Sequence, residues 1–276
     1  MITEVHNEIR VTTWEECVAK VAGIKQDHPD NADTVCFRGQ SDSSWPLTTT
    51  LERRNENRSY TFLEYYRLML RTKPEIESTF GERWEIPSFE DFNEWSRSWD
   101  HKHYTFMAYE FLAHLRHNGF PSPLLDWSSS LYVAAYFAFT SAALNDVAIY
   151  AYLEMPNRMK GSSSDQPAIR ALGPIVRTNR RHFRQQSRYT ICAQYDADTF
   201  DGHKSWRFVP HQEVFNQAPT RQDLLWKIVI PASERMKVLS HLDEFSLNAF
   251  SLFGSEESLM ETLAFREIDR KPPGRS

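Results

Sequence analysis

The sequence has few cysteines, and their spacing suggests neither a disulfide framework nor a metal site. Only three occur in 276 residues, Cys17, Cys36 and Cys192, and no pair has C-x-x-C spacing. Disulfide frameworks use an even number of cysteines, and zinc knuckles use closely paired ones. The sequence therefore argues against both arrangements and indicates a reducing compartment.

Glycine-rich nucleotide motifs are also absent. The sequence contains no P-loop, no G-x-G-x-x-G and no G-x-S-x-G. A nucleotide kinase, a Rossmann dehydrogenase and an α/β-hydrolase therefore lose their main sequence support. If NAD is used at all, we expect it as a substrate.

Membrane-spanning and secretory segments are not expected. The most apolar stretch, residues 131–153, is interrupted by polar residues at 140, 141, 145 and 146, and a bilayer span needs roughly 20 apolar residues. The first ten residues are interrupted by charged and polar side chains and have no continuous apolar centre like that of a secretory signal. We therefore expect a cytoplasmic protein without membrane contact.

The overall composition is that of an ordinary globular protein, with 41% hydrophobic, 13% aromatic and 25% charged residues. The length is near the upper limit for one hydrophobic core, so two tightly packed lobes are an alternative to the single domain over residues 1–276 that we prefer. The net charge of −5 excludes the whole surface as an electrostatic nucleic-acid binder. Any such contact has to come from a local patch.

One local basic patch is present between residues 158 and 188. It has eight Lys or Arg residues against a single acid, Asp165, with the aromatic Phe183 among them and Tyr189 directly after them. Arginines interleaved with aromatics suit nucleic-acid binding, although a solvated loop or a docking surface for an acidic partner has the same composition. The residues that we expect to contact nucleic acid are Arg177, Arg180, Arg181, Phe183, Arg184 and Arg188.

The order of hydrophobic patterns predicts an α+β fold. Thr12 or Thr13 is suited to cap a first helix, and Ser88 begins a pattern typical of a capping box. Residues 147–153 are apolar enough for a central buried strand, whereas residues 155–181 have no apolar period and are expected to form a long loop. The other expected elements are helices at 13–23, 60–118, 130–143, 232–242 and 255–266, and strands at 35–37, 124–127, 189–192 and 226–230.

Three sequence blocks resemble the FRG domain, which is named after its first motif. The first block is FRGQ at residues 37–40, followed by WPL at 45–47 and LER at 51–53. The second is GFPSPLLDWS at residues 119–128 with the apolar helix after it, and the third is RQQ at 184–186. The resemblance spans about residues 35–253. Ser122 stands where the family usually has Thr, and Ser187 stands where it has Gly, which tolerates backbone angles that serine does not.

The order of these blocks is also similar to that of ADP-ribosyltransferases that modify nucleic acid. This resemblance implies a split mixed β-sheet core with a helical insertion over about residues 60–118, and NAD as the ADP-ribose donor without a metal. Arg38 would hold the pyrophosphate or ribose, because a guanidinium fork fits phosphate oxygens. Gly39 and Gln40 would lie beside it in the NAD site.

The same resemblance implies roles for residues in the later blocks. Tyr136 would stack on nicotinamide, and Asp126, Trp127 and Ser128 would form the loop beneath the ribose. Gln186 would occupy the usual place of the catalytic glutamate, with Glu256 or Glu257 as alternative sources of the acid. The basic patch with its aromatic residues favours RNA or DNA over protein as the acceptor, with RNA favoured. FRG-domain proteins also resemble toxins of toxin–antitoxin and phage-defence modules, which implies an antitoxin partner.

Each of these assignments has a simpler alternative. Arg38 could form a structural ion pair, Asp126 and Trp127 could cap a helix and fill the core, and Tyr136 could only pack. At the level of function, the alternatives are an inactive FRG module that binds nucleic acid or a partner protein, and a nuclease that uses Asp126, Glu256 or Glu257 with a divalent ion. The His101-x-His103 and His114-x-x-His117 spacings lack a third metal ligand.

Overall fold

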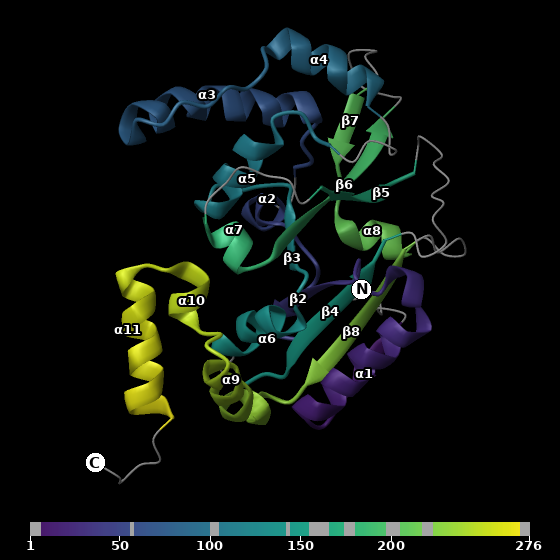
Figure 1. Cartoon of the computed structure of the whole chain (residues 1–276). Helices are drawn as coiled ribbons and strands as arrows, with labels where there is room; N and C mark the ends of the chain where they lie inside the picture. Colours follow the sequence, from purple (N-terminus) through teal and green to yellow (C-terminus); the bar gives the residue numbers. More distant parts are fainter. Residues whose placement is uncertain are drawn as a thin grey trace.

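The computed structural model describes residues 7–55, 58–99, 105–141, 144–154, 166–173, 180–196, 205–216 and 223–270. Within these ranges the chain forms a mixed α and β fold around an eight-stranded sheet (Figure 1). The strand order is β1-β8-β4-β2-β3-β6-β5, and β7 pairs with β6 beside this path. The strands are β1 Glu8–Arg10, β2 Cys36–Gln40, β3 Leu125–Ser128, β4 Val147–Leu153, β5 Ala168–Leu172, β6 Ser187–Asp196, β7 Ser205–Phe208 and β8 Leu224–Ile230.

The sheet is mixed, as the predicted fold class requires. Strands β1 and β8 run parallel, and the other named pairs are antiparallel. All seven residues of β4 are buried, between β2 on one side and β8 on the other. This confirms the predicted central strand, because a run of apolar residues without alternation is covered on both faces.

The sheet opens between its two middle strands. β2 and β3 pair only at Phe37 and Ser128, whereas β2 pairs with β4 at five positions and β3 with β6 at four. The strands therefore separate into a half with β1, β8, β4 and β2 and a half with β3, β6, β5 and β7, and Figure 1 shows different helices around each half. Polar side chains from both halves can meet at this split.

The helices begin where local hydrogen bonds favour them. Thr13 caps α1 by accepting the Glu16 N–H, and Ser88 forms a capping box with Asp91 at the start of α4, as predicted. The helices are α1 Trp14–Asp27, α2 Thr50–Arg54, α3 Phe62–Phe80, α4 Phe89–Ser98, α5 Tyr109–His117, α6 Leu131–Thr140, α7 Arg180–Arg184, α8 His211–Asn216, α9 Arg235–Glu244, α10 Ala249–Phe253 and α11 Glu256–Ala264. Shorter helical turns cover Pro29–Asn31, Ala232–Glu234 and Phe265–Asp269.

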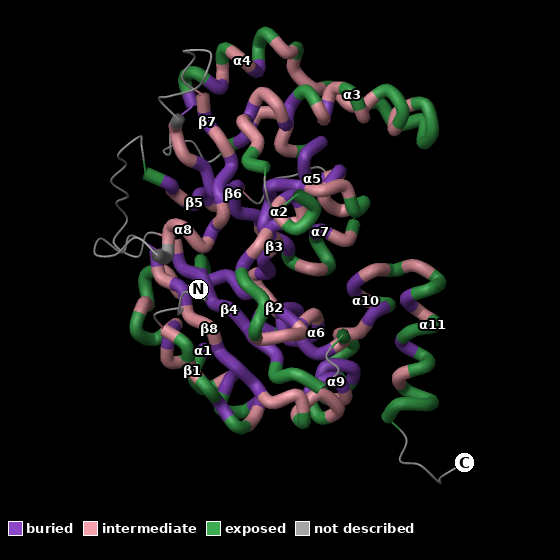
Figure 2. Tube along the Cα trace, turned by 180° about the vertical axis from the view of Figure 1, so that it is seen from behind, coloured by how far each residue is buried: buried purple, intermediate pink, exposed green. Residues whose placement is uncertain are grey.

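Buried hydrophobic residues, which are purple in Figure 2, form three clusters. In the first, α1, α6 and α9 pack on β2, β4 and β8. In the second, α3, α4 and α5 pack on β6 and β7 through rings such as Phe62 and Phe208, whose centroids lie 4.6 Å apart. The third cluster lies between them and includes Trp127 and Tyr152, whose rings stack at 5.2 Å. These clusters fix the helices that border the split.

Helix α6 packs unusually close to β2 at Gly39. A Cβ atom built on Gly39 would lie 1.9 Å from the Ala134 carbonyl oxygen and 2.6 Å from the Ala138 amide nitrogen. Both are backbone atoms of α6, so they cannot turn aside as a flexible side chain would. The glycine of the FRG motif is therefore required here by helix packing.

Some predicted boundaries differ from the structure. α1 continues to Asp27 instead of ending near Gly23, and Arg38 lies inside β2 instead of following a strand. The expected loop over residues 155–181 contains β5, whose central Arg170 is buried and paired with Glu154 at 3.3 Å. A buried ion pair inside a strand hides the apolar pattern by which strands are predicted. The helical segment over residues 60–118 is confirmed by α3, α4 and α5.

No helix in the described part of the chain is long and apolar enough to cross a membrane.

Candidate functional site

A cleft of about 1180 Å³ lies at the split between β2 and β3. Its lining comes from β2 and the loop after it, from α2, β3, α6 and the end of α5, and from the α7–β6 turn. All six residues that the sequence predicts to bind the cofactor line this cleft: Arg38, Gly39, Gln40, Asp126, Trp127 and Ser128. The first and second sequence blocks therefore meet in space, although they are far apart in the chain.

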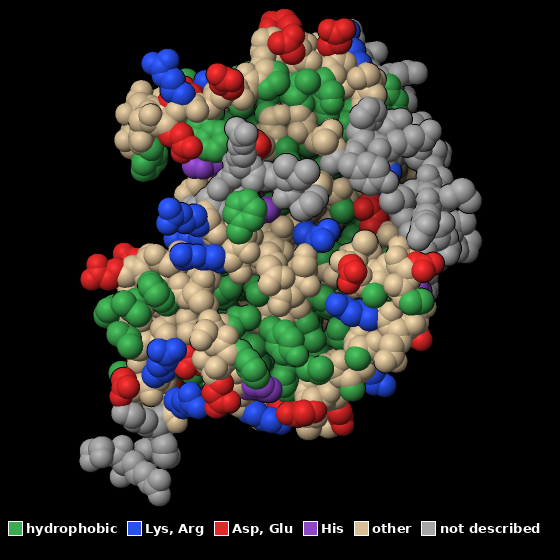
Figure 3. Space-filling view, viewed as in Figure 1, with side chains coloured by type: hydrophobic (Ala, Val, Ile, Leu, Met, Phe, Trp, Pro, Cys, Tyr) green, Lys and Arg blue, Asp and Glu red, His purple; other side chains and the backbone are tan. Residues whose placement is uncertain are grey.

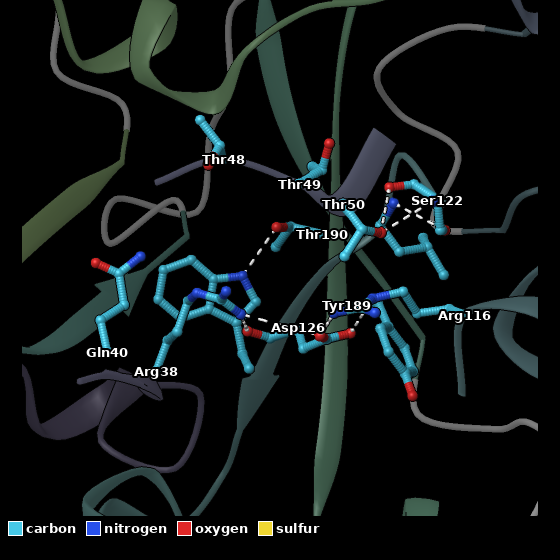
Figure 4. Close-up of polar contacts among 12 residues, drawn as sticks. Arg38, Gln40, Thr48, Thr49, Thr50, Arg116, Ser122, Asp126, Tyr189 and Thr190 are labelled. Atoms are coloured by element: carbon cyan, nitrogen blue, oxygen red, sulfur yellow. Dashed lines mark hydrogen bonds and ion pairs between the residues drawn. The ribbon is translucent and has the colours of Figure 1, made fainter. Parts of the chain in front are cut away.

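Arg38 extends from β2 into the cleft and is held by β3 (Figure 4). Its Nη1 donates a hydrogen bond to the Asp126 carbonyl oxygen at 2.8 Å and lies 4.0 Å from Asp126 Oδ2. The side chain is 13% exposed, and burial lowers the pKa of Arg38 to about 10, against the opposing effect of Asp126. The guanidinium is therefore still charged at neutral pH. Its Nε is buried and has no hydrogen-bond partner among the described residues.

The Asp126 carboxylate is held by a second arginine, Arg116 of α5. Arg116 Nε donates to Asp126 Oδ1 at 3.1 Å, and Arg116 Nη2 donates to Oδ2. Such a bidentate pair fixes both side chains in one geometry. The negative charge of Asp126 is thus used to position two arginines, and it ties the helical segment to the centre of the sheet.

Gln40 lies two residues after Arg38 on the same side of β2, because alternate residues of a strand share a face. Its Nε2 donates to the Pro46 carbonyl oxygen at 3.1 Å, while its buried Oε1 has no partner among the residues that the structure describes. Unpaired buried polar atoms cost about 1–3 kcal/mol each and need a specific explanation. Two of them, Arg38 Nε and Gln40 Oε1, belong to neighbouring side chains of this cleft.

Trp127 is held in place by a chain of buried hydrogen bonds. Its Nε1 donates to Thr190 Oγ1 at 2.9 Å, and this hydroxyl lies 2.8 Å from His211 Nε2. Burial lowers the pKa of His211 to about 3, so that the imidazole is neutral at neutral pH. Trp127 therefore forms part of the rigid support of the cleft.

Ser128 connects the second and third sequence blocks. Its hydroxyl donates to the Gln185 carbonyl oxygen at 2.8 Å and accepts the Ser130 N–H at 3.0 Å. Gln186 has a φ of +48°, and its carbonyl oxygen accepts the Ser129 N–H. Gln185 lines the cleft, whereas Gln186 does not and is exposed. The third sequence block therefore contributes Gln185 to the cleft, and not the predicted Gln186.

Two other predicted catalytic residues lie outside the cleft lining. The Tyr136 hydroxyl faces Glu261 of α11, with Oη 3.3 Å from Oε1, and burial raises the pKa of Tyr136 to about 12. Glu256 is exposed at the start of α11, next to Glu257. Of the four residues to which we assigned catalytic roles, the structure places only Arg38 in the cleft.

The cleft also contains residues to which the sequence gave no role in chemistry. His117 Nε2 hydrogen-bonds to the Tyr189 hydroxyl, and both side chains line the cleft. Burial lowers the pKa of His117 to about 4 and raises that of Tyr189, so at neutral pH this hydrogen bond joins a neutral imidazole to a neutral hydroxyl. The third cleft residue without a predicted role is Glu52, the middle residue of the LER motif. Only its place within a recognised motif could have indicated it.

Positive charge and aromatic rings dominate the lining. Five arginines line the cleft against two carboxylates, Glu52 and Asp126. Two of these arginines lie over aromatic rings of the same lining, Arg58 at 4.5 Å from the centroid of Tyr60 and Arg181 at 5.7 Å from that of Phe253. Trp45 is 51% exposed in the loop after β2. This chemistry suits an anionic ligand with flat rings.

The residues predicted to bind nucleic acid differ in where they lie. Arg180, Phe183 and Arg184 are exposed on α7, which borders the cleft, and Figure 3 shows blue side chains beside a green one over this helix. Phe183 is 64% exposed. Arg181 lines the cleft itself, Arg188 Nε donates to Ser129 Oγ at 2.6 Å, and Arg177 lies outside the described residues.

The histidine pairs with metal-like spacing do not come together as a cluster. His101 and His103 lie outside the described residues, and the ring of His114 packs against Trp84 at 4.5 Å. In the part of the chain that the structure describes, no group of three or more His, Cys, Asp or Glu side chains is arranged to hold a metal ion.

Comparison with known families identifies one domain. The family model described as FRG domain matches residues 33–146, which is less than half of the chain. The matched segment runs from the residues before β2 to those before β4, so it contains the first two sequence blocks and not the third, which we expected to be included. Neither the curated proteins nor the solved structures contain a match to this chain.

Proposed function

The chain carries an FRG domain over residues 33–146, and from this premise we propose that it is an ADP-ribosyltransferase that uses NAD as a substrate and nucleic acid as the acceptor. The FRG domain supplies most of the cleft lining, including Arg38 and Asp126. The nature of the reaction rests on the resemblance of the sequence blocks to such transferases. The type of ligand rests on the cleft.

The observation that carries the proposal is the immobilised Arg38 in a cationic, aromatic cleft. NAD combines a pyrophosphate with two flat rings, and an arginine fork binds phosphate oxygens while aromatic rings stack on bases. The cleft volume of about 1180 Å³ is slightly larger than the roughly 300–1,000 Å³ typical of ligand pockets. A ligand as long as a dinucleotide suits a cleft of this size.

Arg38 has the geometry of a preorganised donor. Its Nη1 is held by the Asp126 carbonyl oxygen, and its Nη2 makes no hydrogen bond to another described residue. A donor that is already oriented needs no rearrangement when the anion binds. We therefore assign the pyrophosphate contact of NAD to Arg38.

In the proposed reaction, the bond between the nicotinamide nitrogen and ribose C1′ breaks. Its electron pair stays on the nitrogen, so nicotinamide leaves as a neutral molecule. A nitrogen or oxygen atom of the acceptor then bonds to C1′ and releases its proton to the solvent. The acceptor would approach over α7, where exposed Arg180, Phe183 and Arg184 offer charge and a stacking surface at the border of the cleft. RNA is favoured because its unpaired bases can stack there.

Modification of nucleic acid would damage the cell that makes the enzyme. We therefore also propose a cytoplasmic toxin that is held inactive by an antitoxin protein and used in defence against phage. The support for this biological role is the resemblance to toxin components, and a co-purifying inhibitor expressed from the same locus would test it.

The transferase proposal is tested with labelled NAD. Purified protein is incubated with separate pools of RNA, DNA and cell-extract protein, beside an Arg38→Ala variant whose folding is checked by circular dichroism. We expect label in the RNA pool, release of nicotinamide, and loss of both with the variant. Absence of label and of nicotinamide release from every pool would contradict the proposal.

A binding module without catalysis is the second candidate. The observation that favours it is the position of Gln186 and Glu256, neither of which lines the cleft. Such a module would shift RNA in a gel without consuming NAD. The nuclease alternative is not favoured, because Arg116 occupies both oxygens of Asp126 and Glu256 lies outside the cleft.

A further inference from the structure

Two carboxylates line the cleft among the described residues, and they differ in how they are bound. Both oxygens of Asp126 receive hydrogen bonds from Arg116. Glu52 accepts the Thr49 N–H through Oε2 at 2.7 Å, while its Oε1 has no hydrogen bond to any residue that the structure describes. Glu52 is therefore the carboxylate with an oxygen left for a ligand.

Glu52 is held rigidly at the start of α2. It forms a reciprocal capping box with Thr49, whose hydroxyl accepts the Glu52 N–H at 3.3 Å and whose side chain is buried. α2 is joined to the second sequence block, because the Leu51 N–H donates to the Ser122 carbonyl oxygen at 3.2 Å and the Ser122 N–H to Thr50 Oγ1 at 3.0 Å.

Figure 4 shows Thr50 hydrogen-bonded to Ser122 and, as a separate group, Arg38 and Arg116 both joined to Asp126. The start of α2 is thus held in a hydrogen-bonded frame with Ser122, which precedes Asp126 in the second sequence block. A carboxylate fixed in such a frame can act on a ligand without first becoming ordered.

The surroundings of Glu52 differ from those of an exposed acid. Burial raises the pKa of Glu52, and so does the nearby negative charge of Glu213, whereas the Thr49 N–H, the Thr49 side chain and the charge of Arg53 lower it. Arg53 lines the cleft beside it. A partly buried carboxylate exerts a stronger field on a nearby charge than an exposed one does, because less water screens it.

We propose that Glu52 is the catalytic carboxylate of this cleft. Its free oxygen accepts a hydrogen bond from a ribose hydroxyl of NAD, and its negative charge stabilises the positive charge that develops at C1′ while the bond to nicotinamide breaks. No bond forms to Glu52, and it leaves the cycle unchanged. This inference rests on the proposed transferase function, and it replaces Gln186 and Glu256 as sources of the acid.

A purely structural role for Glu52 as a helix cap is the alternative, and Glu52→Gln separates the two roles. A capping box accepts glutamine as well as glutamate at this position, so the variant keeps the bond to Thr49 through its amide oxygen, while a neutral NH₂ group that can donate to the ribose hydroxyl takes the place of the charged free oxygen. The matched control is Asp91→Asn, which makes the same kind of change in the capping box that Asp91 forms with Ser88 at α4, outside the cleft lining.

The measurements are the rate of nicotinamide release, the Kd for NAD and the urea midpoint of unfolding. We expect Glu52→Gln to lower the maximal rate by about 100-fold or more, as for removal of one group that stabilises transition-state charge. The Kd and the urea midpoint should stay close to those of the wild type. Asp91→Asn should retain the wild-type rate.

Three outcomes contradict the inference in distinguishable ways. A wild-type rate in Glu52→Gln overturns the role of Glu52 and leaves the transferase intact. A lost rate together with a lower urea midpoint or a weaker Kd shows that Glu52 acts as a cap or in ground-state binding. A wild-type protein that releases no nicotinamide with any pool overturns the transferase proposal, and the role of Glu52 with it.

Discussion

The contact between α6 and β2 makes a sharp prediction for Gly39→Ala. The added methyl group would lie 1.9 Å from the Ala134 carbonyl oxygen and 2.6 Å from the Ala138 amide nitrogen, far inside the 3.0 Å below which Cβ contacts are essentially never seen. Neither atom can move without the helix. The change therefore has to displace α6 from the strand that carries Arg38.

The expected cost follows from the kind of contact. Overpacking a core by a methylene group costs typically 1–3 kcal/mol, and more where the surroundings are rigid. Because both opposing atoms are backbone atoms, we expect Gly39→Ala to lower the free energy of unfolding by about 3 kcal/mol or more. This is a large fraction of the roughly 5–15 kcal/mol that stabilises a typical domain.

Urea denaturation followed by tryptophan fluorescence provides the assay, since the chain has eight tryptophans. The matched control is Gly23→Ala inside α1, where an added Cβ meets nothing within 4 Å. There alanine should stabilise the helix by about 0.5–1 kcal/mol. A Gly39→Ala protein as stable as the wild type would refute the close packing of α6 on β2.

Three further predictions follow from buried polar groups. Burial lowers the pKa of His117 to about 4 and that of His211 to about 3, so below about pH 6.5 the unfolded chain binds protons at these histidines before the folded chain does. The free energy of unfolding should therefore decrease with falling pH, by up to about 1.4 kcal/mol per pH unit for each histidine. A free energy of unfolding that stays constant between about pH 6.5 and 4 in urea titrations would contradict this. Burial raises the pKa of Cys17 to about 12, and all three cysteines are buried, so a thiol reagent should label the protein only in denaturant. Arg116→Ala should lower the free energy of unfolding by roughly 1–3 kcal/mol, because Asp126 loses its bidentate partner. In a double-mutant cycle with Asp126→Asn, the two changes together should cost less than the sum of the single changes.

Features that depend on local contacts could be predicted from the sequence. Thr13 and Ser88 begin helices because each side chain hydrogen-bonds to an N–H only three residues ahead. β4 was predictable because all of its residues are apolar or aromatic and both of its faces are covered. The proximity of Arg38 and Asp126 could be predicted only because both residues lie in recognised motifs. Their separation in the sequence gives no indication that they are in contact.

Features that depend on the direction of a side chain were not predictable. α6 is apolar on nearly all sides, so no polar stripe indicates that Phe137 faces the cleft while Tyr136 faces α11. The paired glutamines present the same difficulty, because the backbone turn at Gln186 exposes one residue and leaves Gln185 at the cleft. β5 was missed because its central arginine is neutralised by an acid from another part of the chain.

Binding of NAD to the cleft tests the central claim most directly. Calorimetric titration with a hydrolysis-resistant NAD analogue can be compared between the wild type and a folded Arg38→Ala variant. We predict saturable binding to the wild type and at least tenfold weaker binding to the variant, a difference of about 1.4 kcal/mol. No binding to the wild type, or equal binding to both proteins, would contradict a role of Arg38 in holding NAD.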